Sequence, residues 1–238
     1  MLPKGILIDL DDTILAYSAI SKPIWIEVCE QFSQKNDKLE PGLLFEKIKE
    51  ISRWYWADPE RNRIGRNDLN HARREVMELV FEKLEVENMP LAHEIADTFQ
   101  TRRDNEIYLF DGAIETLDYL YDKGIPLALM TNGEQSKQRA KINRFDLERY
   151  FKIILIEGEK GFGKPDERVY KKAMEGLGGL KPDECWAVGD NLEADIEGPQ
   201  KLGIYSIWND HRGRGLPKDT DVIPDRIINS IRELIEYK

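Results

Sequence analysis

Hydrophobic positions follow two different spacings along the chain. Residues 5–8 form a short apolar run that ends in the polar segment 9–13, the pattern of a buried parallel strand followed by a turn. From about residue 18 to residue 105, apolar residues instead recur three or four positions apart, the spacing of amphipathic helices. The N-terminal part therefore predicts one strand followed by a long all-helical region.

After residue 110, short apolar runs alternate with helical stretches. The runs cover residues 126–130, 153–156, 186–188 and 204–207. The predicted helices at 113–123 and 169–177 are each followed by a glycine, a common C-terminal stop. This alternation is typical of an α/β fold with a doubly wound, Rossmann-like parallel sheet. We therefore predict that residues 1–16 and 107–238 form an α/β core, and that residues 17–106 form an all-α cap domain inserted after the first strand.

Composition narrows the class of partner. The 238 residues include 35 Lys and Arg against 45 Asp and Glu, which gives a net charge of −10. Charged residues of both signs are scattered along the chain, and the basic ones form no stripe. Nucleic-acid binding is therefore not expected, whereas a small anionic ligand remains compatible, because a bound metal and a few cations reverse the potential inside one cleft. The sequence predicts no oligomeric state.

No apolar run approaches the ~20 residues that span a bilayer, and the N-terminus enters the first strand without a signal-peptide pattern. We therefore expect a cytoplasmic protein with no membrane partner. Cys29 and Cys185 stand far apart and outside any metal-binding spacing, so both are expected to be buried thiols.

Polar residues follow four of the predicted strands, and the carboxyl ends of parallel strands face one crevice. After the first strand, Asp9 and Asp11 are two positions apart, so in an extended chain their carboxylates point the same way and can serve as nucleophile and acid/base. The alternative is that this segment only caps a helix.

The next two segments favour phosphate binding. Thr131 and Asn132 end a strand and open a helix, where a hydroxyl and backbone N–H groups can hold a phosphate oxygen. Lys164 lies in a glycine-containing loop, where its ammonium can offset phosphoryl charge. An ordinary helix cap and a solvated lysine explain each segment equally well when it is taken alone.

Asp190 and Asp195 follow the fourth strand, and clustered carboxylates favour a hard cation such as Mg²⁺. Turn chemistry again explains the segment alone. The order of the four segments, each at a strand end, argues against coincidence, because together they supply nucleophile, acid, cation, hydroxyl and metal ligands.

Residues 9–13, 129–133, 163–166 and 189–195 resemble the four motifs of haloacid dehalogenase-like (HAD) hydrolases, and the helical insertion resembles the cap of many members. Within the family, residues 129–134 and 158–165 look most like the N-acylneuraminate phosphatase and pyrimidine nucleotidase branch. The chain departs from the family pattern at Glu167, where a second proline is common, and at Pro199, where alanine is common.

The resemblance implies a Mg²⁺-dependent phosphatase that hydrolyses a small-molecule phosphate monoester. By this resemblance Asp9 forms an aspartyl-phosphate, and Asp11 protonates the leaving oxygen and then activates water. It also implies that Asp9, the Asp11 carbonyl and Asp190 hold Mg²⁺. Thr131, Asn132 and Lys164 would bind the phosphate, with Asp195 in a supporting role.

Three alternatives stay open at this point. A phosphomutase shares the aspartyl-phosphate step and differs only in the acceptor. A haloacid dehalogenase does not need the second carboxylate that Asp11 provides. A non-catalytic binding protein of the same fold would be expected to lack at least one reacting group, and none is missing here.

Aromatic and basic residues gather in one part of the predicted cap. Trp54, Trp56, Arg63 and Arg66 stand within a short stretch and could line a pocket for an acidic or ring-bearing leaving group. The alternative is that the aromatic residues form the core of the cap and the arginines are solvated.

Overall fold

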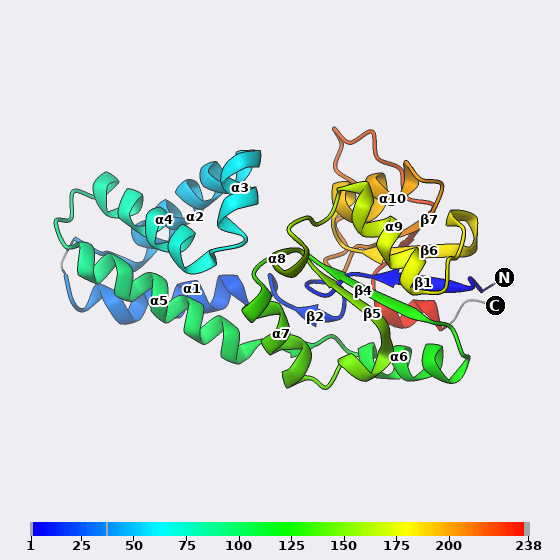
Figure 1. The fold of residues 1–238 in the computed structure, drawn as a ribbon. Helices are drawn as coiled ribbons and strands as arrows, with labels where there is room; N and C mark the ends of the chain where they lie inside the picture. The colour runs from blue at the N-terminus through cyan, green and yellow to red at the C-terminus, as the bar shows by residue number, and fades with distance from the viewer. Residues whose placement is uncertain (1, 37, 236–238) are drawn as a thin grey trace. The chain divides into compact units, whose positions relative to one another are not determined.

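The computed structural model of the chain describes residues 2–36 and 38–235. It divides into two compact units (Figure 1). One unit contains the residues up to Ala16 together with those from Tyr108 onward, and we call it the α/β unit. The other, the helical unit, runs from Tyr17 to Ile107.

Six strands form the parallel sheet of the α/β unit. They are β1 (Gly5–Ile8), β4 (Leu127–Thr131), β5 (Phe151–Ile156), β6 (Cys185–Gly189), β7 (Tyr205–Asn209) and β8 (Arg226–Ile228). Their order is β5-β4-β1-β6-β7-β8, and every adjacent pair is parallel. The predicted fold class is confirmed. Only β8, a short strand at the edge, had no counterpart in the sequence pattern.

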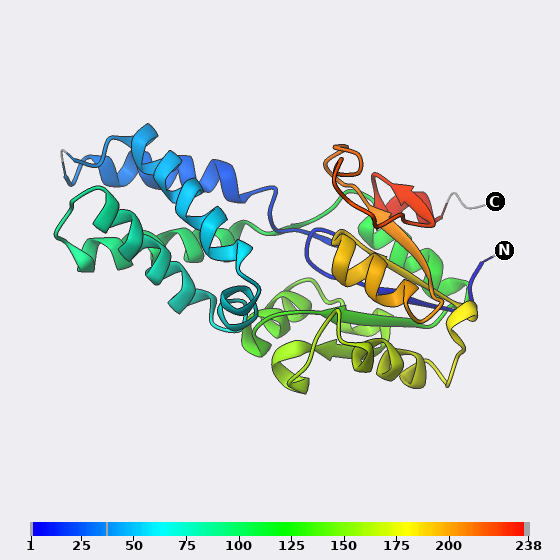
Figure 2. The ribbon, with the colours of Figure 1, turned by 90° about the horizontal axis from the view of Figure 1, so that it is seen from above.

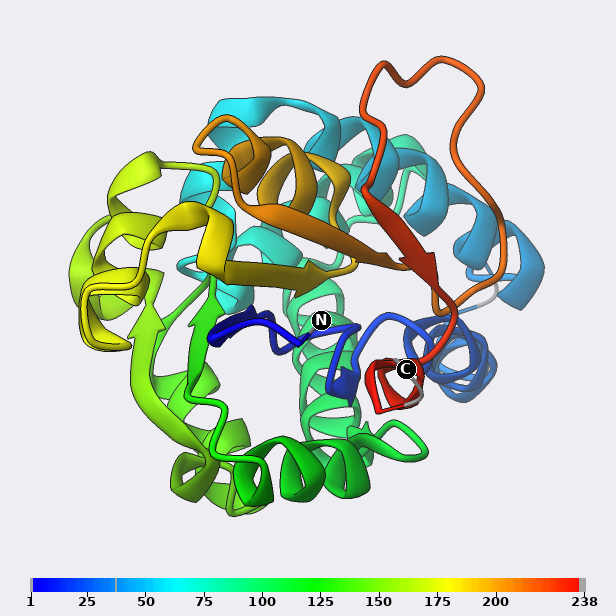
Figure 3. The same ribbon diagram turned by 90° about the vertical axis from the view of Figure 1, so that its right-hand side faces the viewer.

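Helices cover both faces of this sheet, and Figure 3 shows α6 and α10 on opposite sides of it. The helical segments are α6 (Ala113–Asp122), α7 (Gln135–Arg144), η1 (Glu148–Tyr150), α8 (Glu157–Lys160), α9 (Glu167–Gly176), η2 (Pro182–Glu184), η3 (Leu192–Glu197), α10 (Gly198–Gln200) and η4 (Ile231–Leu234). Gly124 and Gly178, which follow α6 and α9, have positive φ angles of 69° and 113°. Both predicted helix stops therefore use glycine's freedom at positive φ.

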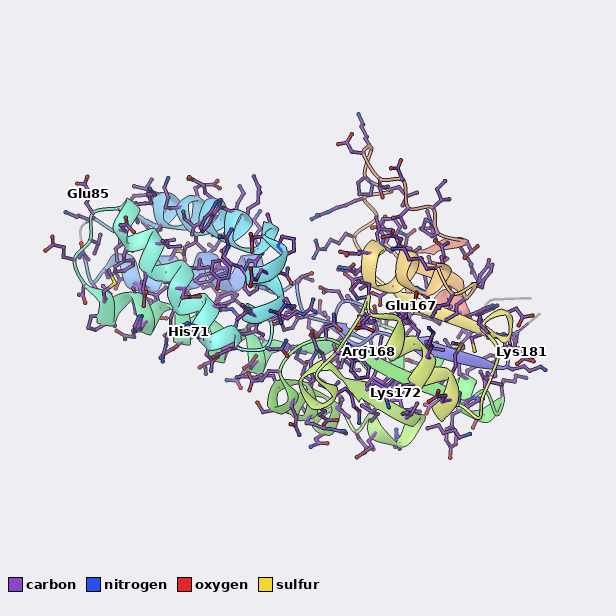
Figure 4. The ribbon with its side chains drawn as sticks, turned by 45° about the horizontal axis from the view of Figure 1, so that its top comes forward. His71, Glu85, Glu167, Arg168, Lys172 and Lys181 are labelled. Carbon is purple, nitrogen blue, oxygen red and sulfur yellow. The ribbon has the colours of Figure 1, made fainter. Side chains whose placement is uncertain are left out.

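Helix α9 shows how sequence pattern becomes packing. Val169, Tyr170 and Ala173 are buried against sheet residues such as Leu7 and Met130. On the opposite side of the helix, Glu167, Arg168 and Lys172 point outward (Figure 4). One apolar stripe thus fixes the helix over β1, β4 and β5, next to the loop that carries Lys164.

The helical insertion begins and ends at a two-stranded antiparallel ribbon. Strand β2 (Leu15–Ala16) pairs with β3 (Tyr108–Leu109), and the N–H of Phe110 donates to the carbonyl of Ile14 at 2.9 Å. Strands of two residues are too short to give an alternating pattern, so the sequence did not predict them.

Among the residues that the structure describes, five helices build the helical unit (Figures 1 and 2). They are α1 (Ser21–Ser33), α2 (Pro41–Ala57), α3 (Pro59–Gly65), α4 (Leu69–Lys83) and α5 (Met89–Glu106). Four begin at an acidic or amide residue whose side chain accepts hydrogen bonds from backbone N–H groups of the first turn. These residues are Glu40, Asp58, Asp68 and Asn88. No described helix combines the length and apolar character that crossing a membrane requires.

Both cysteines are free and buried, one in each unit, which confirms the expectation from the sequence. Burial raises the pKa of Cys29 to about 12 and that of Cys185 to about 11. We predict that neither thiol reacts with a disulfide reagent at neutral pH until its unit opens. The variants Cys29→Ser and Cys185→Ser each leave one thiol, so labelling rates report the two units separately. Immediate labelling of either folded variant would contradict the prediction.

Candidate active site

The carboxyl ends of three adjacent strands bring the predicted residues together. Asp9 follows β1, Thr131 ends β4 and Asp190 follows β6, and β1 lies between the other two strands. Lys164 reaches the same edge from the loop after β5 and α8. The sheet order therefore places on one edge residues that are up to 181 positions apart in the sequence.

Lys164 links two of these carboxylates. Its Nζ atom lies 2.6 Å from Asp9 Oδ1 and 2.6 Å from Asp195 Oδ1, and all three residues are buried. The second oxygen of Asp9 accepts a hydrogen bond from the Thr13 hydroxyl at 3.2 Å. Asp9 is thus held by a donor on each oxygen, and Asp195 lies where it can orient the lysine.

Asn132 fixes the loop that carries Lys164. Its Nδ2 donates to the Lys164 carbonyl at 2.7 Å, and its Oδ1 accepts from the Lys164 N–H at 2.8 Å. A Cβ atom at Gly163 would lie 2.4 Å from that Oδ1, so the close approach requires glycine. The sequence suggested Asn132 as a phosphate ligand, but both polar atoms of its side chain are engaged in placing Lys164.

The turn after β4 is also partly occupied by the protein itself. The Gly133 N–H donates to the Glu157 carboxylate at 3.0 Å, so this backbone donor is not free for a phosphate, contrary to our expectation for the segment. The Thr131 hydroxyl lies 2.6 Å from Gln138 Nε2 and is buried beside the strand end. Thr131 is therefore the part of this segment best placed to act on a ligand.

Asp11 has a binding partner that the sequence analysis missed. Lys141 Nζ lies 2.9 Å and 2.6 Å from its two carboxylate oxygens, and Gln138 Nε2 lies 3.0 Å from Oδ2. Gln138 and Lys141 are three residues apart on α7, so they share one helix face. That spacing, in the helix directly after Thr131 and Asn132, was the signal available in the sequence.

Three carboxylates form a group that could hold a metal ion. One oxygen each from Asp9, Asp190 and Asp195 lies within 4.8 Å of the others. A Cβ atom at Gly189 would lie 2.2 Å from Asp195 Cγ, so glycine is required for Asp195 to reach the group. The Trp208 indole donates to the Asp190 carbonyl at 2.7 Å and fixes this end of β6. The Asp11 carboxylate, turned toward Lys141, is not part of the group.

The protonation of these residues reflects crowded negative charge. Burial raises the pKa of Asp9 to about 7, an increase that Lys164 opposes and Asp195 reinforces. Burial together with the charges of Asp9, Asp195 and Asp12 raises the pKa of Asp190 to about 9. Burial alone would lower the pKa of Lys164, but the charges of Asp195 and Asp9 raise it.

This donor set fits a divalent cation. When ionised, the three carboxylates and one ammonium leave an excess of two negative charges in a buried volume, and the ligand atoms are the hard oxygens that Mg²⁺ prefers. A second group of possible ligands, Asp12, Asp190 and His211, shares one member with the first.

The suggested specificity residues of the helical unit separate into two pairs. Trp54 is 53% exposed and is stacked by Arg61, whose Cζ lies 3.9 Å from its ring centroid, and Arg63 is also exposed. Trp56 and Arg66 instead line a cavity inside the unit, together with Arg73 and Arg103, which the sequence analysis did not single out.

Two relatives with similar sequences are named as phosphatases. A phosphoserine phosphatase of Thermus thermophilus is 33% identical over 180 residues, which span 75% of this chain and 65% of that relative. The N-acylneuraminate-9-phosphatase of Mus musculus is 28% identical over 233 residues, covering 97% of this chain and 92% of the relative.

A solved structure has a similar fold. The solved structure of the HAD-hydrolase YfnB from Bacillus subtilis, bound to magnesium, superposes with a TM-score of 0.75 at 21% identity and covers 99% of this chain and 98% of its own. The family model described as haloacid dehalogenase-like hydrolase matches residues 3–203. The suspected resemblance is thereby confirmed, and this chain belongs to the haloacid dehalogenase-like hydrolases.

Proposed function

We propose that this hydrolase is a Mg²⁺-dependent phosphatase that cleaves a small-molecule phosphate monoester through an aspartyl-phosphate on Asp9. The observation that carries the proposal is the bridge in which Lys164 Nζ lies 2.6 Å from both Asp9 and Asp195. A fixed ammonium beside a buried carboxylate suits attack on an anionic group, because the cation attracts the oxygens that surround the phosphorus. Two relatives named as phosphatases support the same reaction type.

In the first half-reaction, an Asp9 carboxylate oxygen forms a bond to phosphorus while the bond to the leaving oxygen breaks. Asp11 gives a proton to that leaving oxygen. In the second, Asp11 takes a proton from water, the water oxygen bonds to phosphorus, and the phosphorus–oxygen bond to Asp9 breaks. Inorganic phosphate leaves, and both aspartates return to their starting states.

Asp9, Asp190 and the Asp11 carbonyl would hold the metal. When bound, Mg²⁺ supplies positive charge that reduces the repulsion between the anionic ester and the carboxylates. Lys164 contributes a further positive charge, and the Thr131 hydroxyl contributes a donor for a phosphoryl oxygen. Asp195 keeps the Lys164 ammonium in place through its contact at 2.6 Å.

The environment of Asp11 favours ester cleavage over dehalogenation. Lys141 and Gln138 hold its carboxylate through three contacts of 2.6–3.0 Å, so the group has a defined position beside the strand end. A positioned acid assists departure of an alkoxide, whereas a halide leaves without a proton. A second carboxylate held in this way serves the phosphatase reaction.

The first test measures inorganic phosphate released from an aryl phosphate by the purified protein. Release should require Mg²⁺ and fall to background in Asp9→Asn, because the amide lacks the nucleophilic oxyanion. Asp111→Asn, which changes an aspartate whose side chain is 99% exposed, is the matched control and should keep full activity. Undiminished turnover in excess chelator, or an active Asp9→Asn protein, would remove the proposed mechanism.

Replacing Asp11 tests the acid/base assignment. Asp11→Asn should slow the cleavage of alkyl phosphates by about 10²–10⁴-fold, the usual contribution of general acid–base catalysis. Nitrophenyl phosphate should lose less in the first half-reaction, because its leaving group hardly needs the proton, and aspartyl-phosphate should accumulate. Pre-steady-state product release from both esters measures the difference. Equal losses without a covalent intermediate would argue against Asp11.

The raised pKa values of Asp9 and Asp190 predict how stability depends on pH. Between the ordinary value of 3.8 and their folded values of about 7 and 9, both groups bind more protons in the folded protein than in the unfolded chain. The free energy of unfolding of the metal-free protein should therefore fall as pH rises through this window.

Mg²⁺ should accordingly raise the melting temperature more at about pH 8 than at about pH 5, because the ion competes with the protons. Thermal melts with and without the ion at both pH values measure this difference, and Asp190→Asn should lose most of it. An equal increase at both pH values would count against a metal site built on these carboxylates.

A further inference from the structure

The helical unit contains a cavity of its own. Its volume is about 330 Å³, which lies within the range of ~300–1,000 Å³ typical of small-molecule sites. All residues that line it belong to the helical unit, with contributions from α1, α2, α3, α4 and α5.

Two buried arginines line this cavity. Arg73 on α4 and Arg103 on α5 are only 8% and 5% exposed. His71, two positions before Arg73, instead points outward from α4 (Figure 4). Both guanidinium groups lie near the Phe99 ring, with Cζ atoms 5.5 Å and 5.4 Å from its centroid. Two like charges thus occupy one buried region.

The hydrogen bonds of Arg73 and Arg103 do not use all of their N–H groups. Arg73 Nη2 lies 3.4 Å from the Tyr17 hydroxyl, and Arg103 Nη2 lies 3.3 Å from Gln100 Oε1. Within the part of the chain that the structure describes, neither side chain forms an ion pair with a carboxylate. Arg73 Nη1 and Arg103 Nε are buried without a hydrogen-bond partner. Buried donors of this kind are rare and costly unless a ligand satisfies them.

The lowered pKa of Arg73 also favours a bound anion. Burial, and next the charge of Arg103, lower the pKa of Arg73 to about 10. The Tyr17 side chain and the charge of Asp104 offset only part of this effect, and a bound anion would stabilise the buried cation further.

We propose that this cavity binds a small organic carboxylate, held by the guanidinium groups of Arg73 and Arg103, which both line it. Guanidinium groups are the side chains best suited to donate to both oxygens of a carboxylate. The other walls suit a flat ring. Trp25 stacks on Phe99 with centroids 3.8 Å apart and planes within 7°, and Trp56 also lines the space.

Binding is tested on the full-length protein with benzoate as the probe and benzamide, which has nearly the same shape without the charge, as its control. Trp25 and Trp56 line the cavity, so intrinsic fluorescence reports occupancy, and calorimetry gives the affinity. Benzoate should bind and benzamide should bind at least roughly tenfold more weakly, because a charge-assisted hydrogen bond is lost. Equal binding of the two probes, or binding of neither, would overturn the proposal.

Matched variants locate the site. Arg73→Gln and Arg103→Gln should each weaken benzoate roughly 10- to 100-fold. Arg74→Gln and Arg102→Gln, which change the neighbouring arginines that pair with Asp97 and Glu27, should leave its affinity unchanged. Should a glutamine variant fail to fold, the contrast between benzoate and benzamide in the unaltered protein still decides. Wild-type affinity in both folded variants would overturn the site.

A kinetic arm, which rests on the proposed phosphatase function, identifies the source of the carboxylate. If it belongs to the substrate, a phosphorylated hydroxybenzoate should exceed phenyl phosphate in kcat/KM at least tenfold in the wild-type protein, and benzoate should compete with it. If it belongs to a separate effector, benzoate should alter turnover of phenyl phosphate without competing with it. An inactive wild-type protein would refute the phosphatase function, and the fluorescence result would still decide the cavity.

Discussion

The arrangement of the active-site residues in the α/β unit depends on one ion-pair cluster, in which the Lys164 ammonium lies between the buried carboxylates of Asp9 and Asp195. Lys164, Asp9 and Asp195 are each less than 10% exposed, and three buried charges of this kind are stable only with close pairing and further hydrogen bonds. The fold supplies those hydrogen bonds through Asn132, which fixes the lysine loop, and through the Asn191 N–H, which donates to Asp195 Oδ2 at 3.0 Å. The glycines at 163 and 189 follow from the same requirement, because any side chain there would occupy the space of these partners.

The sequence predicted the fold class because the spacing of apolar residues is a local signal. It placed Asp9, Thr131, Lys164 and Asp190 on one edge because the carboxyl ends of parallel strands share an edge. Contacts between side chains on different elements were harder to predict. The engagement of Asn132 with Lys164 and of Lys141 with Asp11 depends on distances across loops that no spacing rule encodes. The two-residue strands β2 and β3 were missed because strands this short give no alternating pattern.

In the helical unit, sequence proximity was a poor guide. Trp54 and Arg63 lie near Trp56 and Arg66 in the chain, yet the first two are exposed while the second two line a cavity. Residues of other helices complete that cavity, and the packing of α4 against α5 brings Arg73 and Arg103 to it.

The pairing of β2 with β3 has an architectural consequence. Because Ala16 and Tyr108 are register partners, the two points at which the chain leaves and re-enters the α/β unit are neighbours. A segment whose ends are already adjacent adds little closure entropy to the host, whatever its own length. Because this ribbon fixes both ends of the insertion, helical segments of other lengths can replace the insertion without altering the register of the six-stranded sheet.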